Sequence, residues 1–225
     1  MLRRLNAADL PALLELHAAV MAALPDPSLF RLFGGARSFL SSHFGERGES
    51  LGLFDGERVL AYGSLTLPMA DDADNYARNL DWPPQRAGRV ALLSAAMVDP
   101  SHRGQGLHPA LIEARLQLAA ERGAVEVLVR AAPANAQSRR TLLAHGFAIV
   151  WLGVQAEGSL RHVMWRPVAQ PAWLGEGGEG GEGGEGDRCW VAAEDLEEHK
   201  RLLREGWIGV AAREADAAIG FARQR

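Results

Sequence analysis

Apolar and polar positions follow two different periods along the first ninety or so residues. Residues 10–24 carry apolar side chains three or four positions apart, which predicts a helix with one buried face. Residues 50–55 and 59–68 are apolar and β-branched, and the Asp55-Gly56-Glu57-Arg58 turn between them predicts a hairpin. Residues 1–5 are a further strand candidate, and residues 30–44 are expected to form a loop followed by a short helix.

The second half of the pattern predicts a sheet with interleaved helices. A buried strand is expected over residues 90–98, and an apolar stripe over residues 107–123 predicts a helix that Gly123 ends. Another strand, a short helix and a closing hairpin follow at residues 124–131, 136–145, and 147–154 with 161–167. Together these elements predict an α/β (α+β) fold: a mixed sheet of about seven strands, flanked by helices.

The composition changes abruptly after the last hairpin. Residues 175–186 repeat Glu-Gly-Gly and offer no apolar side chain to bury, so residues 168–187 are expected to form a flexible acidic linker after a main domain of residues 1–167. Residues 188–225 predict a small βαββ-like extension, with a Glu197–Arg201 pair on its helix. So short a segment rarely folds alone, so we expect it to dock on the main domain or on a partner subunit.

Composition and charge narrow the class of protein. The 225 residues carry a net charge of −4 with dispersed Lys and Arg, which makes nucleic acid a poor partner. The single cysteine, Cys189, excludes an internal disulfide and a cysteine-cluster metal site, as suits a cytoplasmic protein. No apolar run reaches membrane-spanning length, so no membrane or signal segment is expected.

The densest chemical information lies between the strand at residues 90–98 and the helix that follows it. Asp99-Pro100 stops the strand, and Ser-His-Arg-Gly-Gln-Gly-Leu-His forms the loop of residues 101–108. A glycine loop at a helix N-terminus presents unpaired N–H groups and a positive dipole end, which suits a pyrophosphate. The loop has neither a Gly-Lys-Ser/Thr ending nor a three-glycine fingerprint, which argues against a magnesium-bound triphosphate or a dinucleotide.

This loop resembles that of the GNAT superfamily of N-acetyltransferases, which reads Arg/Gln-x-x-Gly-x-Gly/Ala. The matching residues are Arg103, Gly104, Gln105, Gly106 and Leu107, while His108 stands where the family usually has Gly or Ala. A second segment, with Asn135, Ser138 and then His145-Gly146-Phe147, is similar to the family's second motif. The resemblance covers residues 1–167 and implies a GNAT-type, mostly antiparallel sheet.

The resemblance also implies a function: transfer of an acetyl group from acetyl-CoA, as co-substrate and without a metal, to an amine. The loop of residues 103–108 would bind the pyrophosphate. Backbone groups of Met97 and Val98 would contact the pantetheine arm where two strands splay apart, and Asn135 with Ser138 would bind on the pantetheine or phosphate side. In this mechanism the amine attacks the thioester directly, without an acyl-enzyme.

Catalytic residues are not assigned by the sequence. The position where some relatives carry a glutamate falls near Leu92. The family often has a tyrosine that protonates the leaving thiolate, and Leu142 stands at that position here. An amine with a pKa near ~10.4 needs a base or a pocket that disfavours the ammonium. Possible substitutes stay open, namely Asp71, Asp72, Asp74, His17 and a water held by Ser94.

Two other functions remain open at this level. The missing glutamate and tyrosine are compatible with a non-catalytic acyl-CoA-binding module that acts through residues 188–225. A phosphate-binding fold of another kind could also use the segment Arg103–Gly106. The acceptor amine and the oligomeric state, including a possible homodimer, are not determined by the sequence.

Overall fold

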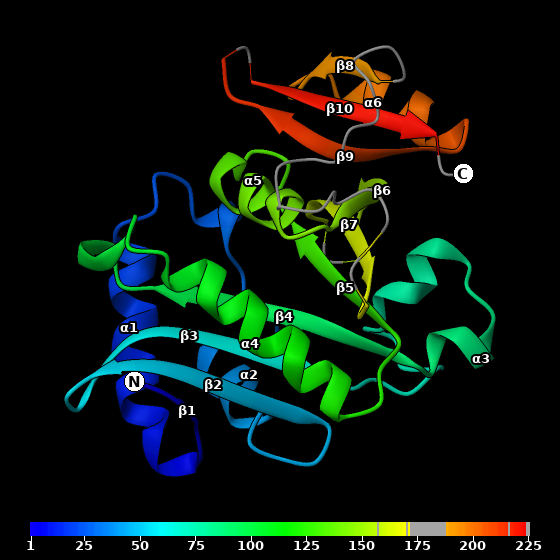
Figure 1. Cartoon of the computed structure of the whole chain (residues 1–225). Helices are drawn as coiled ribbons and strands as arrows, with labels where there is room; N and C mark the ends of the chain where they lie inside the picture. The colour runs from blue at the N-terminus through cyan, green and yellow to red at the C-terminus, as the bar shows by residue number, and fades with distance from the viewer. Residues whose placement is uncertain (157, 170, 172–187, 216, 224–225) are drawn as a thin grey trace. The chain divides into compact units, whose positions relative to one another are not determined.

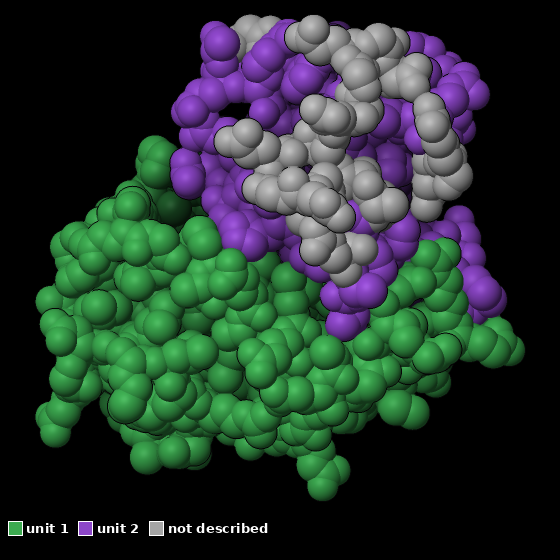
Figure 2. All heavy atoms as spheres, viewed as in Figure 1, with its two compact units in different colours: residues 1–75, 84–127 green, residues 76–83, 128–225 purple. Residues whose placement is uncertain are grey.

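The computed structural model of the chain describes residues 1–156, 158–169, 171, 188–215 and 217–223. The chain divides into two compact units, Met1–Asn75 with Pro84–Val127 and Tyr76–Pro83 with Leu128–Arg225 (Figure 2). The predicted Glu-Gly-Gly linker lies outside the described residues. Among the helices that are described, none is long and apolar enough to cross a membrane.

The first unit is an antiparallel sheet in the order β1-β2-β3-β4, with helices on both faces (Figure 1). Its elements in chain order are β1 (Leu2–Arg4), η1 (Ala7–Asp9), α1 (Leu10–Ala22), η2 (Pro27–Leu29), α2 (Ala36–Ser41), β2 (Gly48–Asp55), β3 (Arg58–Thr66), α3 (Pro84–Ala87), β4 (Val90–Val98), η4 (Pro100–His102) and α4 (Leu107–Glu121).

Neighbouring residues of β3 show how the two faces of this sheet are covered. Tyr62 is buried in an apolar cluster with Leu13 of α1 and Leu40 of α2. The next residue, Gly63, lies against the Arg115 side chain of α4. Because successive strand residues point to opposite faces, α1 and α2 cover one face and α4 covers the other.

The ladder between β3 and β4 is interrupted by one extra residue. Ser64 pairs with Ala95, and the next pair joins Leu65 to Leu93, so Ser94 has no partner across the ladder. This is the arrangement of a β-bulge, which bends the strand and redirects a side chain. The bulge lies in the strand that leads to the glycine loop.

Arg115 fills the space behind this bulge. Its side chain is 2% exposed and donates hydrogen bonds to the carbonyl oxygens of Leu111 (2.9 Å), Ala95 (3.0 Å) and Ser64 (3.3 Å). Burial lowers the pKa of Arg115 to about 10, so the guanidinium is still charged at neutral pH. This cation therefore ties α4 to both central strands at the point where their pairing is irregular.

The second unit contains the remaining strands in the order β5-β7-β6-β9-β10-β8. Its described elements are η3 (Tyr76–Leu80), β5 (Glu126–Ala131), α5 (Ala136–Ala144), β6 (Ala148–Val154), β7 (Leu160–Pro167), β8 (Cys189–Ala192), α6 (Leu196–Arg204), β9 (Trp207–Arg213) and β10 (Ala218–Arg223). The first two residues of β5 belong to the first unit.

The C-terminal strands extend the sheet of the second unit. Residues Ile149 of β6 and Gly209 of β9 are antiparallel partners, and a Cβ added at Gly209 would lie 3.1 Å from the Ile149 Cβ. Phe221 and Ile219 of β10 are fully buried. The division of the chain into a domain, a linker and a docked extension stays a prediction.

The predicted fold class is confirmed: the structure is a mixed α/β fold with a mostly antiparallel sheet flanked by helices. One predicted detail is wrong. On α6, Arg201 pairs with Glu198 and Glu205, whereas Glu197 pairs with Lys200. The predicted pair does not form because Glu198, three residues before Arg201, and Glu205, four residues after it, take the guanidinium instead.

We expect Gly63→Ala to destabilise the first unit, because its Cβ would lie 2.8 Å from Arg115 Nε and 3.0 Å from Cζ. Overpacking of this kind costs about 1–3 kcal/mol, measurable by urea denaturation. Gly45→Ala is the control, since a Cβ there meets nothing within 4 Å. Equal stability of the two variants would show that the Arg115 side chain can move away from an added Cβ at no cost.

Candidate active site

Asp99 fixes the start of the glycine loop. Its carboxylate accepts hydrogen bonds from the Ser101 backbone N–H (2.9 Å) and hydroxyl (2.6 Å), and from Arg58 Nη2 at 2.5 Å. The bond from the Ser101 hydroxyl makes the largest contribution to holding the pKa of Asp99 well below its ordinary value, and Arg58 acts in the same direction. The loop therefore leaves β4 in a defined direction.

The two glycines of the loop adopt backbone conformations that favour glycine. Gly104 has φ 78° and Gly106, the N-cap of α4, has φ 75°. A Cβ added to either residue meets nothing within 4 Å, so the space beside the loop is open. A side chain at either position would occupy the space through which a bulky anion approaches the backbone.

The same loop carries backbone donors that the protein does not use. Within the described residues, the N–H groups of Gly104, Gln105, Gly106 and Leu107 donate no hydrogen bond. They precede a helix of 15 residues, whose dipole places partial positive charge at this end. Arg103 is exposed beside them, and His108 lies half-buried in the first turn of α4. Backbone donors in this arrangement can bind an anion such as a diphosphate.

Met97 and Val98 occupy the last two positions of β4. The Met97 side chain is 1% exposed and packs in the cluster beneath α1, whereas Val98 is half-buried. They pair across the ladder with Tyr62 and Ala61 of β3. In an antiparallel strand the backbone groups point alternately to the two edges, so part of this backbone faces away from β3.

In the second unit, Asn135 is the N-cap of α5. Its Oδ1 accepts the Ser138 backbone N–H at 3.1 Å, which explains why an asparagine precedes this helix. Within the described residues its amide nitrogen makes no hydrogen bond, so this group can donate to a ligand oxygen. The Ser138 side chain is half-buried.

The His145-Gly146-Phe147 segment ends α5 in a defined way. The Phe147 N–H donates to the Leu142 carbonyl and the Gly146 N–H to the Leu143 carbonyl, both at 3.0 Å. This pair of bonds is a Schellman motif, which explains the Gly-Phe pair as a helix stop. Leu142 itself is 2% exposed and apolar, so it supplies no proton to a leaving thiolate.

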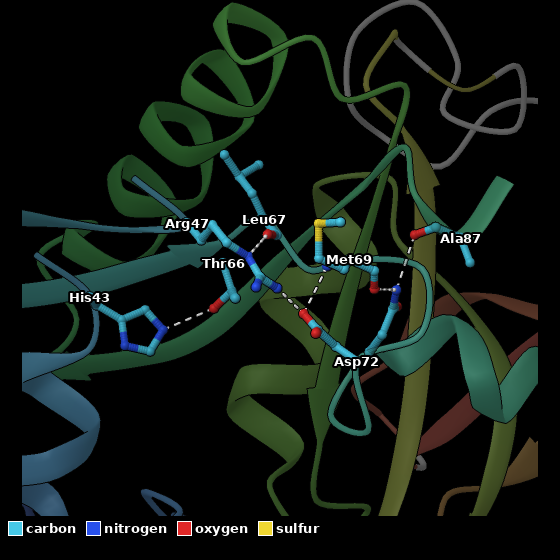
Figure 3. A network of polar contacts seen from close by, with 8 residues as sticks. His43, Arg47, Thr66, Leu67, Met69, Asp72 and Ala87 are labelled. Carbon is cyan, nitrogen blue, oxygen red and sulfur yellow. Dashed lines mark hydrogen bonds and ion pairs between the residues drawn. The ribbon is translucent and has the colours of Figure 1, made fainter. Parts of the chain in front are cut away.

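The acidic loop after β3 does not present all of its carboxylates to solvent. Asp72 forms an ion pair with Arg47 and accepts the Met69 backbone N–H at 2.8 Å (Figure 3). Asn75 then donates to the carbonyl oxygens of Met69 and Ala87, both at 3.0 Å. Asp72 therefore has a structural partner, while the other two predicted carboxylates, Asp71 and Asp74, are exposed.

Leu92 and His17, two positions considered for the base, lie on β4 and α1. Leu92 is 1% exposed in β4, so this position carries no base. His17 is half-buried on α1 with its ring centroid 6.2 Å from that of Phe30, and burial lowers its pKa. Among the described residues, no three His, Cys, Asp or Glu side chains form a group that can hold a metal ion.

Sequence reasoning missed a polar chain next to the bulge. His43 Nε2 lies 2.8 Å from Thr66 Oγ1 (Figure 3). Thr66 Oγ1 contacts the Ser94 hydroxyl in turn. A signal for it was present in β3, where Tyr62, Ser64 and Thr66 put hydroxyls at alternate positions of a buried strand. Buried hydroxyls on one strand face need partners. Thr66 has partners on neighbouring elements, whereas the buried Ser64 hydroxyl has no hydrogen-bond partner among the described residues.

The sequence matches a known family over most of these elements. A sequence model of the acetyltransferase (GNAT) family aligns with residues 14–147, which is more than half of the chain. The chain is thus an acyltransferase by class. It belongs to the GNAT acetyltransferase family, whose donor is acetyl-CoA, and this membership does not favour a non-catalytic module.

Solved structures share the fold at low sequence identity. The ribosomal-protein-S18-alanine N-acetyltransferase of Escherichia coli is 20% identical with a TM-score of 0.55, and the alignment covers 79% of this chain and 97% of that one. A GCN5-related N-acetyltransferase from Kribbella flavida is 21% identical with a TM-score of 0.53, covering 74% and 96%. The PaiA N-acetyltransferase of Thermoplasma acidophilum, solved with coenzyme A, is 13% identical with a TM-score of 0.53, covering 74% and 98%. No curated protein sequence matches the chain.

We expect Asp99→Asn to lower the free energy of unfolding at pH 7 by about 1–3 kcal/mol, because charged hydrogen bonds to Ser101 and Arg58 are lost. Since folding lowers the pKa of Asp99, its contribution is complete at pH 7 and declines as pH falls below about 4. Urea titrations at pH 7 and pH 3 measure the difference.

The control for this measurement is Asp55→Asn, which changes an exposed carboxylate at the end of β2. We expect only Asp99→Asn to show a stability loss that shrinks at the lower pH. A loss of the same size at both pH values would contradict the role given to the Asp99 charge.

Proposed function

We propose that this chain transfers the acetyl group of acetyl-CoA to an amine by direct attack of the amine on the thioester. The observation that carries the proposal is the loop at the start of α4, with its two left-handed glycines and four unused N–H donors. Such donors are fixed before the ligand arrives, so they bind a diphosphate without reorganisation.

The site residues are proposed with separate roles. Backbone N–H groups from Gly104 to His108 hold the diphosphate, and Arg103 adds positive charge at the exposed side. Backbone groups of Met97 and Val98 contact the pantetheine arm. In the second unit, the Asn135 amide nitrogen and the Ser138 hydroxyl are proposed as further donors to the coenzyme.

The chemistry asks little of the protein beyond positioning and proton transfer. A thioester is already reactive, and holding it next to the amine converts a bimolecular reaction into an intramolecular one. The sulfur leaves as a thiolate, which nearby dipoles stabilise and water protonates. This suits a chain in which the position of the family's tyrosine is an apolar residue, Leu142.

The cellular location of the protein, its partners and its acceptor are predictions from the sequence. The single cysteine favours the cytoplasm, and the dispersed charge gives no reason to expect nucleic acid or a membrane as partner. The acceptor is proposed to be a small amine or an exposed amino group.

Purified protein mixed with acetyl-CoA and a panel of amines should release free thiol. The panel holds spermidine, glucosamine, lysine and a peptide with a free N-terminal alanine, and a thiol reagent follows the release. We expect turnover well above acetyl-CoA hydrolysis with at least one acceptor. Release at background level for every acceptor would contradict the proposed transferase activity.

Gly106→Val should weaken binding of coenzyme A by at least about tenfold, because the side chain enters the space of the diphosphate. The matched control is Gly123→Val. Gly123 ends α4 with φ 76° and also has open space around it, so this variant introduces the same backbone strain far from the loop. Calorimetry on both variants should show a loss only for Gly106→Val, and unchanged affinity would mean that another loop binds the coenzyme.

A further inference from the structure

The protonation state of His43 follows from its hydrogen bonds. Its Nδ1 lies 2.8 Å from the Phe39 carbonyl oxygen, which can only accept, so Nδ1 carries the proton. In the neutral imidazole Nε2 is then the acceptor, and it lies 2.8 Å from Thr66 Oγ1. Thr66 therefore donates its hydroxyl proton to His43.

The chain of hydroxyls continues to β4. Because the Thr66 proton points to His43, its oxygen accepts from the Ser94 hydroxyl with which it is in contact. Ser94 is the extra residue of the bulge and is half-buried. The result is a directed chain from Ser94 through Thr66 to the lone pair of His43.

The other end of this chain reaches solvent. His43 is 6% exposed and lines an open pocket of about 180 Å³, together with Gly48, Glu49 and Ser50 of β2. Solvent in this pocket therefore lies beside the residue at the end of the chain of hydroxyls.

We infer that His43 is the general base of the transfer reaction and that Thr66 and Ser94 relay the proton to it from the attacking amine. This inference rests on the proposed function and names the base that the sequence leaves unassigned. Its basis is the direction of the hydrogen bonds, the bulge at Ser94 and the opening at His43.

The step balances as follows. The neutral amine forms an N–C bond to the thioester carbon, which leaves a positive charge on nitrogen. That nitrogen passes a proton to Ser94 Oγ, the Ser94 proton moves to Thr66, and the Thr66 proton moves to His43 Nε2. The C–S bond breaks, sulfur departs with the electron pair and takes a proton from water. The imidazolium then loses its proton to water in the pocket, and the hydroxyls rotate back.

The surroundings of His43 shift its pKa in opposite directions. Asp74, in the loop after β3, favours the protonated ring, and so does the hydrogen bond to the Phe39 carbonyl. Glu49 on β2 lines the same pocket, where Arg4 and Arg122 hold it in ion pairs. Burial outweighs both of these effects and lowers the pKa of His43 below its ordinary value, so the imidazole is neutral at pH 7 and can accept a proton.

The test compares His43→Gln, Thr66→Val and Ser94→Ala, with acetyl-CoA as donor and the most active amine of the panel as acceptor. We expect His43→Gln and Thr66→Val each to lower kcat about 100-fold with unchanged affinity for coenzyme A, as loss of a general base does. Ser94→Ala should lower kcat less, because a water molecule can take the place of the lost hydroxyl. The double variant His43→Gln/Thr66→Val should be no slower than either single one, since both belong to one relay.

Two measurements separate this role from simple packing. In the unmodified protein the acid limb of kcat/KM, calculated on the concentration of neutral amine, should coincide with the His43 pKa measured by nuclear magnetic resonance, and it should disappear in His43→Gln. Ser42→Ala is the matched control: its hydroxyl is 3.1 Å from Nδ1, on the side of the ring away from the relay. It should keep both kcat and the acid limb.

The outcomes are distinguishable. Wild-type kcat and an unchanged acid limb in folded Thr66→Val and His43→Gln would overturn the relay while leaving the transferase intact. An acid limb that does not match the His43 titration would overturn it without any variant. Absence of thiol release by the unmodified protein with every acceptor would overturn the proposed function, and the relay with it.

Discussion

The first unit depends on one buried cation, the guanidinium of Arg115. The bulge between β3 and β4 disrupts the regular ladder, and a buried carbonyl left without a donor costs about 1–3 kcal/mol. Arg115 supplies donors to the carbonyls of Ser64 and Ala95, and to Leu111 in its own helix. A buried cation is itself costly, and these carbonyl dipoles offset that cost. The bulge can therefore exist inside a packed sheet, and α4 is fixed to it.

Backbone groups without a partner in the ladder also define the glycine loop that follows β4. There the unpaired backbone groups face open space instead of an arginine, so they remain available for a ligand. This part of the site was predictable because its chemistry is local: strand stop, glycines and helix start follow one another within residues 99–109. The fold class was predictable for a similar reason, since each element shows its own period and its own stop signal.

Contacts between distant residues were not predictable in the same way. Arg115 lies one turn after Leu111 on an apolar helix face, so the sequence shows a polar exception there but not the strands that it serves. His43, Thr66 and Ser94 come from three elements, separated by 23 and 28 residues. A periodic pattern shows which face of a strand is buried, but it does not show which side chain from another element meets that face. The register and the bulge determine that, and neither is visible in one sequence.

The position of the charges explains why a relay suits this chain better than a carboxylate on β4. Leu92 is almost fully buried, so an ionised side chain there would lose its hydration without a partner. Hydroxyls carry no charge, and here Ser94 donates to Thr66 and Thr66 to His43, so they can lie inside the sheet at low cost. The ionisable group is then displaced to His43, beside a solvent-open pocket whose ion pairs keep other charges compensated. A base at this distance is neutral when it accepts the proton and close to water when it releases it.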